Sequence, residues 1–491
     1  MVEKIAHKLT RNPRLVALIA VLLLIPSALG YIGTRVNYDI LTYLPQDLES
    51  SQGERLLEEP FHMAATSMLI VEDMPAAYTN SLIYAIRQVP NVSNAVWLSN
   101  AVGIQIPIDF IPANLRDMFY AGDATMIIIQ YDKSGADEDT MKAIQAVRDI
   151  CNEKCFLAGF SVVIKDTKDL VDRELPVYVA LAVVLSLIAM SLTMESVVLP
   201  FVFLASIGMA IVYNFGTNIL LGQISYITKA IAAVLQLGVT MDYSIFLYHR
   251  YLEEKGRYED KRDAMTQAIV AAFTSLSGSS LTTIAGFIAL CFMRLTLGRD
   301  IGIVMAKGVV LGVATVILVL PALLLLFDKQ IEKHKHRSLL PDFTRVNGWI
   351  VRRRRWLAVL FLLLFPPALY AQSHAGVYYK LDEALPQDMA SIVANNKLKD
   401  EFDMATSHFV LLRDDLSATD MNRMEGELKE VEGVTSVLSY HAMLGAGIPD
   451  FFIPEDVRDM LKQGGWQMMM INSEYPTASD DVSRQLKEIG A

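Results

Sequence analysis

Apolar residues along this chain are concentrated in seven long spans, separated by polar stretches of very unequal length. A helix needs roughly 20 apolar residues to cross the hydrocarbon core of a bilayer. The pattern therefore predicts a multi-pass α-helical membrane protein with seven transmembrane helices. They are expected at residues 15–32, 176–192, 197–215, 224–250, 268–293, 301–327 and 356–373.

The longest polar stretch, residues 34–174, has the mixed pattern of a folded soluble domain. Runs rich in β-branched residues predict strands, and stretches with helical periodicity predict helices. The strands are expected at residues 66–71, 124–131 and 156–164, and the helices at residues 76–88 and 137–150. Their alternation predicts a compact α+β domain, with one sheet and helices on one of its faces.

Four short motifs of the first half, PQD, ATS, FIP and RDM, return in the second half. They begin at Pro45, Ala65, Phe110 and Arg116, and again at Pro386, Ala405, Phe452 and Arg458. Several motifs at nearly one shift indicate an internal parallel repeat, and duplicated halves are typical of transporters. The repeat also indicates that the first span is a retained helix and not a cleaved signal peptide, because its counterpart lies inside the chain.

The spans and the repeat divide the chain into six segments. These are an N-terminal segment with the first span (1–33), a soluble α+β domain (34–174), a membrane core of five spans (175–327), a basic linker (328–355), the seventh span (356–374) and a second, incomplete soluble domain (375–491). In the register of the repeat, Ala491 corresponds to Asp149 or Ile150, so the last strand of the second domain is still missing. We therefore expect a truncated product, with five further spans in the complete protein.

Basic residues indicate how the spans are oriented. They precede the first span and gather after the even-numbered spans, above all in residues 328–355. Because cytoplasmic loops carry an excess of lysine and arginine, the N-terminus and the linker are expected in the cytoplasm of a cell-membrane protein, and both soluble domains outside. The four arginines at 352–355 are expected to contact lipid headgroups. The charged segment 251–264 is predicted to be an amphipathic surface helix.

The composition also indicates a membrane protein and restricts the kinds of partner that it can bind. Hydrophobic residues make up 53% of the 491 residues, and the net charge of −11 argues against nucleic acid as a partner. Only three cysteines occur, so no disulfide framework is expected. Cys151 and Cys155 have the spacing of one helix face and could pair in an oxidising compartment. Metal binding is disfavoured, because no histidine lies near them in the sequence.

Asp242 is the candidate functional residue, because it lies well inside the apolar run 224–250. A carboxylate at that depth costs several kcal/mol on insertion scales, and ionisable groups inside membranes usually mark ion or proton paths. The competing interpretation is that the helix ends earlier and Asp242 lies among the headgroups. Gly238 is four residues away on the same face, where it would let a neighbouring helix approach closely.

Other residues of the membrane core are candidates for supporting Asp242. Lys307 is a candidate internal partner, whereas Lys229 is expected to reach outward or to contact the base of the soluble domain. His249 either passes protons to the cytoplasm or lies at the interface without a special role. Small and hydroxyl residues recur in the fifth span and predict a close packing seam, with or without hydrogen bonds to Asp242. They are Ser275, Gly278, Ser279 and Thr282.

The stretch GVTMDYSIFLYHRY, from Gly238 to Tyr251, and the Ser/Thr/Gly-rich residues 268–290 carry a family resemblance. Together with the order of one span, a soluble domain and five spans, they resemble the MMPL branch of the RND superfamily of exporters. The resemblance implies export of lipids, drugs or other hydrophobic or amphiphilic compounds, driven by a proton gradient without a cofactor. It also implies that Asp242 and Tyr243 belong to the proton relay, and that the soluble domains form an extracytoplasmic porter.

The chain departs from the family pattern because it ends inside the second soluble domain. The second set of membrane helices, with the partner acidic helix, is absent. The expected partners are thus the missing second half, membrane lipids and a hydrophobic or amphiphilic substrate, and the pattern also allows an oligomer. Two other interpretations stay open: a lipid-sensing or protein-translocation protein with the same core, and an inactive fragment. An ATP-driven or enzymatic membrane protein is disfavoured, because no GxxxxGK[ST] loop, nucleophile elbow or HExxH motif occurs.

Overall fold

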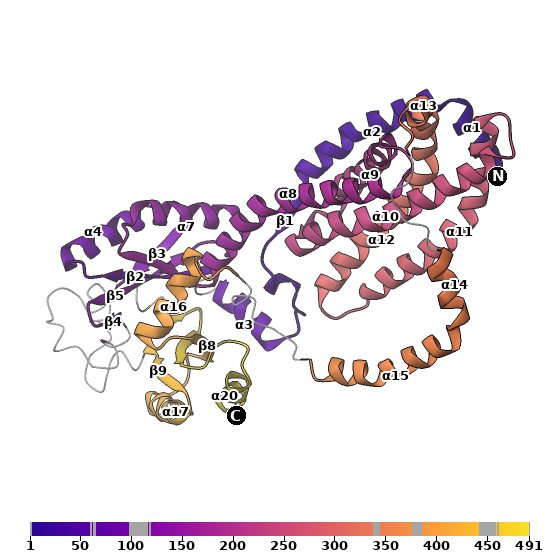
Figure 1. Cartoon of the computed structure of the whole chain (residues 1–491). Coiled ribbons are helices and arrows are strands. Elements are labelled where there is room, and N and C mark those ends of the chain that lie inside the picture. Colours follow the sequence, from indigo (N-terminus) through magenta and orange to yellow (C-terminus); the bar gives the residue numbers. More distant parts are fainter. Residues whose placement is uncertain are drawn as a thin grey trace. The chain divides into compact units, whose positions relative to one another are not determined.

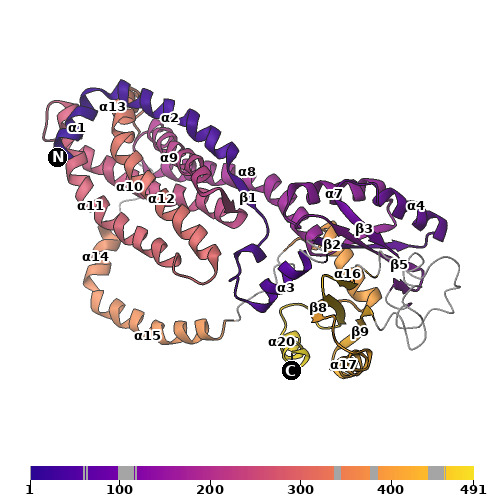
Figure 2. The same ribbon diagram turned by 180° about the vertical axis from the view of Figure 1, so that it is seen from behind.

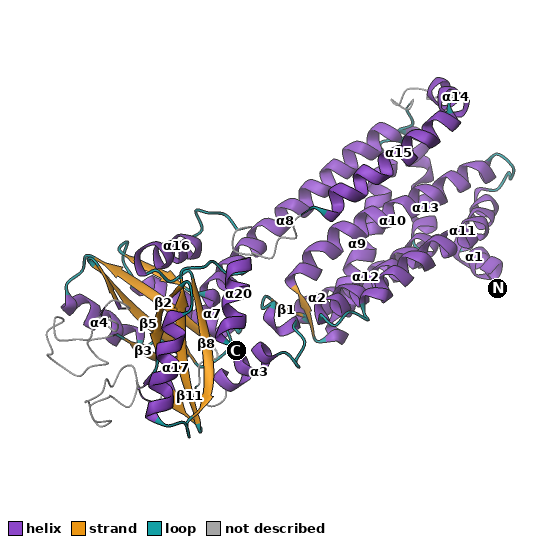
Figure 3. Ribbon diagram, turned by 90° about the horizontal axis from the view of Figure 1, so that it is seen from below, coloured by secondary structure: helices purple, strands orange, loops and turns teal. Residues whose placement is uncertain are grey.

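The chain forms two compact units in the computed structural model, which describes residues 2–58, 61, 65–97, 116, 119–336, 344–375, 385–440, 458 and 461–490. The first, here called the membrane unit, comprises Met1–Tyr43 and Asp172–Tyr378. The second, here called the sheet unit, comprises Leu44–Val171 and Tyr379–Ala491. Figure 3 shows that all the long strands belong to the sheet unit, whereas the membrane unit is almost entirely helical.

Seven helices in the described residues are long and apolar enough to cross a membrane, which confirms the multi-pass class. They are α2 (Pro13–Gly33), α8 (Phe160–Thr193), α9 (Val198–Gly216), α10 (Tyr226–Lys255), α11 (Lys261–Leu290), α12 (Thr296–Leu318) and α15 (Arg354–Ser373). Helices α9 to α12 lie in one bundle, which Figures 1 and 2 show from opposite sides. Their side chains bury a shared apolar core. Helix α15 buries none of its residues against the described chain.

Shorter helices and one small sheet complete the membrane unit. Amphipathic α1 (Val2–Arg11) packs on α11, and Thr10 Oγ1 lies 2.8 Å from Thr266 Oγ1 in the contact. Helix α14 (Thr344–Arg352) precedes α15. Strand β1 (Arg35–Asn37) pairs in parallel with β7 (Gln223–Ser225), which follows the 3-10 turn η3 (Thr217–Leu221).

The sixth predicted span, 301–327, is wrong as a single helix. Helix α12 ends at Leu318 and α13 (Leu320–Lys333) begins beyond Val319. Pro321 explains the break, because its ring removes a main-chain N–H donor and is compatible with a helix only in the first turn.

The predicted surface helix at 251–264 is also wrong. Helix α10 continues to Lys255 and is followed by a turn before α11 begins at Lys261. Asp260 caps the start of α11, since its side chain accepts a hydrogen bond from the main-chain N–H of Arg262 at 2.9 Å. The charged segment is therefore divided between two long helices and the turn that joins them.

The first half of the sheet unit is a five-stranded sheet. Its strands are β2 (Ala65–Glu72), β3 (Val92–Val96), β4 (Tyr120–Ala121), β5 (Ala124–Tyr131) and β6 (Cys155–Ala158), in the order β3-β5-β2-β6 with β4 beside β5. Helices α4 (Ala76–Ile86) and α7 (Glu138–Ile150) share an apolar core with it, and α3 (Glu49–Glu58) precedes it. The predicted strand 156–164 is too long, because Gly159 (φ 116°) turns the chain and α8 begins at Phe160.

The second half of the sheet unit repeats these elements. Strands β8 (Thr406–Arg413), β9 (Val434–Leu438), β10 (Lys462–Gln463) and β11 (Trp466–Ser473) form a second sheet, with α16 (Ala390–Phe402), α17 (Ala418–Glu430) and α20 (Asp480–Ile489). The two sheets share an apolar core rich in methionine, which includes Met68, Met126, Met468 and Met470.

The strand pairing shows how the two repeats correspond. Thr66 lies opposite Gln130 in the first sheet, and Ser407 lies opposite Asn472 in the second. The shift of 342 between Arg116 and Arg458 also relates Gln130 to Asn472, so their partners Thr66 and Ser407 are equivalent at a shift of 341, one residue more than the shift of 340 between the two ATS motifs. The FIP and RDM motifs lie outside the described residues, apart from Arg116 and Arg458.

Candidate functional site

Helix α10 carries the predicted site, and its two faces differ. Ser225 begins the helix, because its hydroxyl oxygen accepts a hydrogen bond from the main-chain N–H of Ile227 at 3.2 Å. Side chains three or four residues apart, such as Tyr243 and Leu247, then pack in the core of the membrane unit. The opposite face is exposed and includes Val234 at 48%.

Asp242 and Tyr243 lie on different sides of α10. Tyr243 is 7% exposed and belongs to the core, whereas Asp242 is exposed. Consecutive residues of an α-helix are about 100° apart, and on α10 the boundary between the exposed and the buried face falls between these two residues. The side chain of Asp242 forms no ion pair or hydrogen bond with the described residues. Asp242 is thus a carboxylate on the outer surface of an apolar helix bundle.

The small and hydroxyl residues predicted near Asp242 are exposed as well. A Cβ atom added at Gly238 on α10 or at Gly278 on α11 would meet nothing within 4 Å. Thr282 Oγ1 donates to the main-chain oxygen of Ser279 at 2.7 Å, within its own helix. Helices α10 and α11 pack on each other. We call this set the acidic surface: Gly238, Asp242, Ser275, Gly278, Ser279 and Thr282.

Lys307 contacts α9. Its Nζ atom donates to the main-chain oxygen of Asn214 at 3.0 Å and to Oδ1 of Asn218 at 2.5 Å. Asn214 lies in the last turn of α9, where main-chain oxygens lack intrahelical partners and a cation offsets the helix dipole. Lys307 therefore caps the end of α9, and no contact with Asp242 occurs in the described structure.

Lys307 belongs to a buried polar network with Asn214, Asn218 and Gln236. This network was not predicted from the sequence. Asn214 Nδ2 donates to Gln236 Oε1 at 2.9 Å, and Gln236 Nε2 donates to the main-chain oxygen of Gly308 at 3.2 Å. Asn214 Oδ1 and Asn218 Nδ2 are buried without a partner in the described structure. The sequence carried a signal for this network, because amide side chains inside apolar spans are costly without partners.

Two glycines of α12 lie close to polar side chains of α9 and α10. A Cβ atom at Gly308 would lie 2.7 Å from Asn214 Nδ2, and one at Gly312 would lie 2.6 Å from Thr240 Oγ1. Both distances are too short for a real side chain. Small residues at these positions therefore let α12 approach α9 and α10 closely.

Lys229 contacts α8 near the opposite end of α10. Its Nζ atom lies 4.0 Å from Asp172 Oδ1, which also accepts a hydrogen bond from the Tyr38 hydroxyl at 2.9 Å. The Tyr38 ring stacks on Tyr226 with 5.4 Å between the ring centroids. Lys229 thus contacts Asp172, the residue at which the membrane unit resumes after the sheet unit. His249 is exposed, and its ring lies 6.4 Å from that of Tyr248.

Cys151 and Cys155 do not share a helix, so the spacing argument was wrong. Helix α7 ends at Ile150, and Cys155 begins β6. Asn152 makes the turn between them, since its side-chain oxygen accepts a hydrogen bond from the main-chain N–H of Lys154 at 2.9 Å. Both cysteines are free thiols, and a hydrogen bond from Cys151 lowers the pKa of Cys155 below its ordinary value.

The fold and the acidic surface define a multi-pass helical membrane protein with an appended pair of repeated α+β sheets. The MMPL family matches residues 81–359, and the chain belongs to this family. ActII-3, a membrane protein of Streptomyces coelicolor, is 27% identical over 350 residues, which cover 67% of this chain and 47% of the relative.

Two similar proteins have names that state a cargo. The siderophore exporter MmpL5 of Mycobacterium tuberculosis is 23% identical over 246 residues, covering 47% of this chain and 25% of the relative. The mycolic acid-containing lipids exporter MmpL11 of Mycolicibacterium smegmatis is 27% identical over 188 residues, which cover 35% of this chain and 20% of the relative. The chain spans about half the length of the first curated relatives it matches, 47% and 57%.

Proposed function

We propose that the protein to which this chain belongs exports lipids or other hydrophobic or amphiphilic compounds across a membrane. A proton gradient drives the export, and Asp242 carries the proton. The observation that supports this best is the exposed carboxylate of Asp242 on the apolar helix α10, which packs on α11, a helix whose small and hydroxyl residues are exposed as well.

The chemistry of Asp242 suits proton coupling. A charged carboxylate is unfavourable in hydrocarbon, and the neutral acid is much less so. Gain and loss of one proton therefore change which helix packing is favoured, and two packings are what a proton-driven transporter alternates between. Because Tyr243 is the next residue and lies in the core, a small rotation of α10 at Asp242 also repacks Tyr243.

The open space at the acidic surface is suited to contact with a second set of membrane helices. Gly238 and Gly278 have open space where a Cβ atom would lie, so another helix backbone can come close to each. A hydrogen-bonding or acidic group on that helix would shield Asp242 from lipid. The greater length of the relatives agrees with such a second half.

The cargo class rests on the names of the relatives. A siderophore exporter and a mycolic acid-containing lipids exporter are similar to this chain. Siderophores and lipids share amphiphilic or hydrophobic character, and that is the class proposed here. The test is a transport assay in proteoliposomes containing the complete protein, with a proton gradient and after its collapse by a protonophore.

Orientation is a separate, testable part of the proposal. With the native cysteines removed, single cysteines at Lys4 and Lys335 should react with membrane-impermeant reagent only from the cytoplasmic side. Single cysteines at Tyr84 and Glu138, in the sheet unit, should react only from outside. The other basic residues of the two segments, such as Lys8 and Lys333, keep those segments in the cytoplasm in these variants. If Glu138 and Lys335 variants react from the same side, the proposed topology is wrong.

A further inference from the structure

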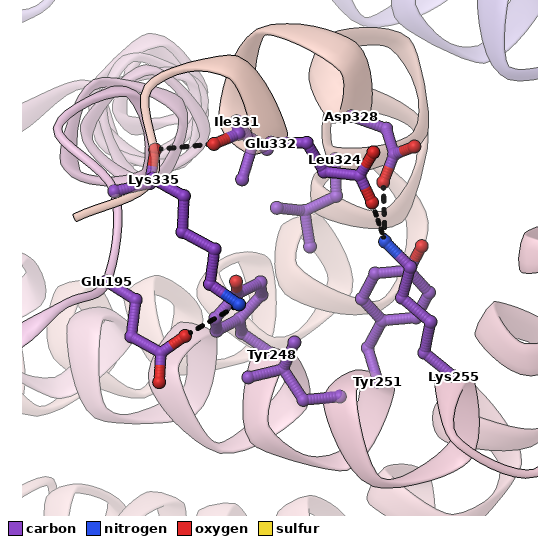
Figure 4. A pocket seen from close by; sticks show the side chains of 11 residues that line it. Glu195, Tyr248, Tyr251, Lys255, Leu324, Asp328, Ile331, Glu332 and Lys335 are labelled. Carbon is purple, nitrogen blue, oxygen red and sulfur yellow. Dashed lines mark hydrogen bonds and ion pairs between the residues drawn. The ribbon is translucent and has the colours of Figure 1, made fainter. Parts of the chain in front are cut away.

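Charged side chains around one cavity of the membrane unit are paired with one another. The cavity has a volume of about 220 Å³ and lies between the turn that joins α8 and α9, the C-terminal part of α10, and α13 (Figure 4). On one side, Lys335 Nζ lies 3.0 Å from Glu195 Oε2. On the other, Lys255 Nζ lies 3.3 Å from Asp328 Oδ1 and 2.6 Å from Glu332 Oε1. These side chains satisfy one another, whereas two free thiols of the sheet unit can still react.

Cys151 and Cys155 lie next to each other across one tight turn of the sheet unit. Cys151 follows the last residue of α7, and Cys155 is the first residue of β6. The main-chain N–H of Cys155 donates to the main-chain oxygen of Asn152 at 3.1 Å, and its thiol lies 3.4 Å from Asn152 Oδ1. The turn therefore directs the Cys155 sulfur back toward the end of α7, where a hydrogen bond joins it to the thiol of Cys151.

Neighbouring elements hold this turn in place. The main-chain N–H of Glu72, at the end of β2, donates to the oxygen of Lys154 at 3.0 Å. Lys154 Nζ lies 2.5 Å from Asp73 Oδ2, and Cys155 pairs with Val71 in the sheet. Both cysteines also pack against the apolar core that α4 and α7 share with this sheet. The fold, and not only the short spacing in the sequence, thus keeps the two sulfur atoms together.

The hydrogen bond between the thiols makes Cys155 the more reactive of the two. It lowers the pKa of Cys155 to about 6 against the effect of burial, and the Tyr78 hydroxyl contributes in the same direction. The pKa of Cys151, which donates this hydrogen bond, is raised. The thiolate is the form that attacks other sulfur atoms, and Cys155 is only half-buried, so small molecules can reach it. Cys155 is therefore suited to react first and Cys151 second.

We propose that Cys151 and Cys155 are a reversible oxidation site, at which a disulfide forms across this turn. The Cys155 thiolate attacks a small-molecule disulfide such as glutathione disulfide, forms a mixed disulfide and releases one glutathione thiolate, which takes up a proton. The Cys151 sulfur loses its proton, attacks the Cys155 sulfur of the mixed disulfide and releases the second glutathione. Two thiols of the chain are thereby oxidised, and one glutathione disulfide is reduced to two glutathione thiols. The site does not depend on the proposed export function.

The disulfide would join the end of α7 to an edge strand. In the described sheet, β6 is the last strand beside β2, and the chain continues from it through Gly159 into α8. Strands at a sheet edge open more easily than central ones, because fewer contacts hold them. Oxidation would therefore fix the strand from which the long helix α8 begins.

Mass spectrometry of the purified chain tests the site. The chain is reduced, freed of reductant, incubated in detergent with glutathione disulfide, denatured and labelled with a maleimide. Three cysteines are present, so the reduced chain should take three labels, and the oxidised chain should take one, at Cys291. Because Lys154 lies between the paired cysteines, trypsin should release residues 149–154 and 155–165 joined by a disulfide.

Single variants and a denatured control separate this site from chance oxidation. Cys151→Ser should stop at the mixed disulfide on Cys155, because no second thiol resolves it. Cys291→Ser is the matched control and should leave the pairing unchanged. In a titration with reduced and oxidised glutathione, the equilibrium constant for disulfide formation should be about tenfold larger in the folded chain than in urea and sodium dodecyl sulfate. The reason is that the held turn raises the effective concentration of one thiol at the other.

Three results would each overturn the proposal. The first is three maleimide labels on the wild-type chain after incubation with glutathione disulfide. The second is glutathione that stays bound to Cys155 while Cys151 is present. The third is an equal equilibrium constant in the folded and the denatured chain, which would mean that the fold does not bring the thiols together.

Discussion

Asp242→Asn in the complete protein should abolish proton-driven export and leave expression and membrane insertion intact. The substitution removes the only titrating group of the acidic surface and lowers the cost of placing α10 in the membrane. Asp242 forms no ion pair in the described chain, so no partner loses its counter-charge. Export in proteoliposomes should fall to the level of empty vesicles, with the amount of inserted protein unchanged.

Two further variants sharpen this experiment. Asp242→Glu keeps the titrating group and should retain part of the activity. Tyr243→Phe keeps the aromatic packing and removes only the hydroxyl that the family resemblance assigns to the proton relay, so it should cause a partial loss. Val234→Asn places an amide on the same exposed side of α10 and is the control for polarity alone. If the Asp242→Asn protein still exports in a gradient-dependent way, Asp242 is not the proton carrier.

Gly216→Val should strongly destabilise the membrane unit. A Cβ atom at Gly216 would lie 2.3 Å from the main-chain oxygen of Ser27 and 2.4 Å from its Cα atom. The same close approach is seen from α2, because a Cβ atom at Gly30 would lie 2.2 Å from the main-chain oxygen of Gly216. These neighbours are main-chain atoms that cannot rotate away, so α2 must separate from α9.

The expected loss of stability from Gly216→Val is about 3 kcal/mol or more, at or above the upper end for overpacked sites. It should appear as aggregation in detergent or as a large drop in the melting temperature. Gly208→Val on the same helix is the matched control, because a Cβ atom there meets nothing within 4 Å. Similar destabilisation by both variants would mean that β-branching in α9, and not the contact with α2, causes the effect.

Much of the fold was readable from the sequence, because the signals involved are local. A run of apolar residues crosses a membrane wherever it occurs, so all seven spans were found, and β5 was predicted with its observed bounds. The break at Val319 was missed, since Pro321 sits inside a continuous apolar run that hides it. The end of β6 was missed for a similar reason: Phe160–Ile164 is apolar enough for either a strand or a helix, and the turn at Gly159 decides between them.

The candidate site likewise has residues that the sequence identifies and contacts that only the structure shows. Asp242 was identifiable from its position alone, because a carboxylate in an apolar run is costly in any fold. The partner of Lys307 could not be identified from the sequence. Its ammonium donates to the main-chain oxygen of Asn214 at the end of α9, and these two residues are 93 positions apart in the chain. Which face of α10 Asp242 occupies depends likewise on where α9, α11 and α12 pack. Helix periodicity defines the two faces of α10, but only tertiary packing determines which face is covered.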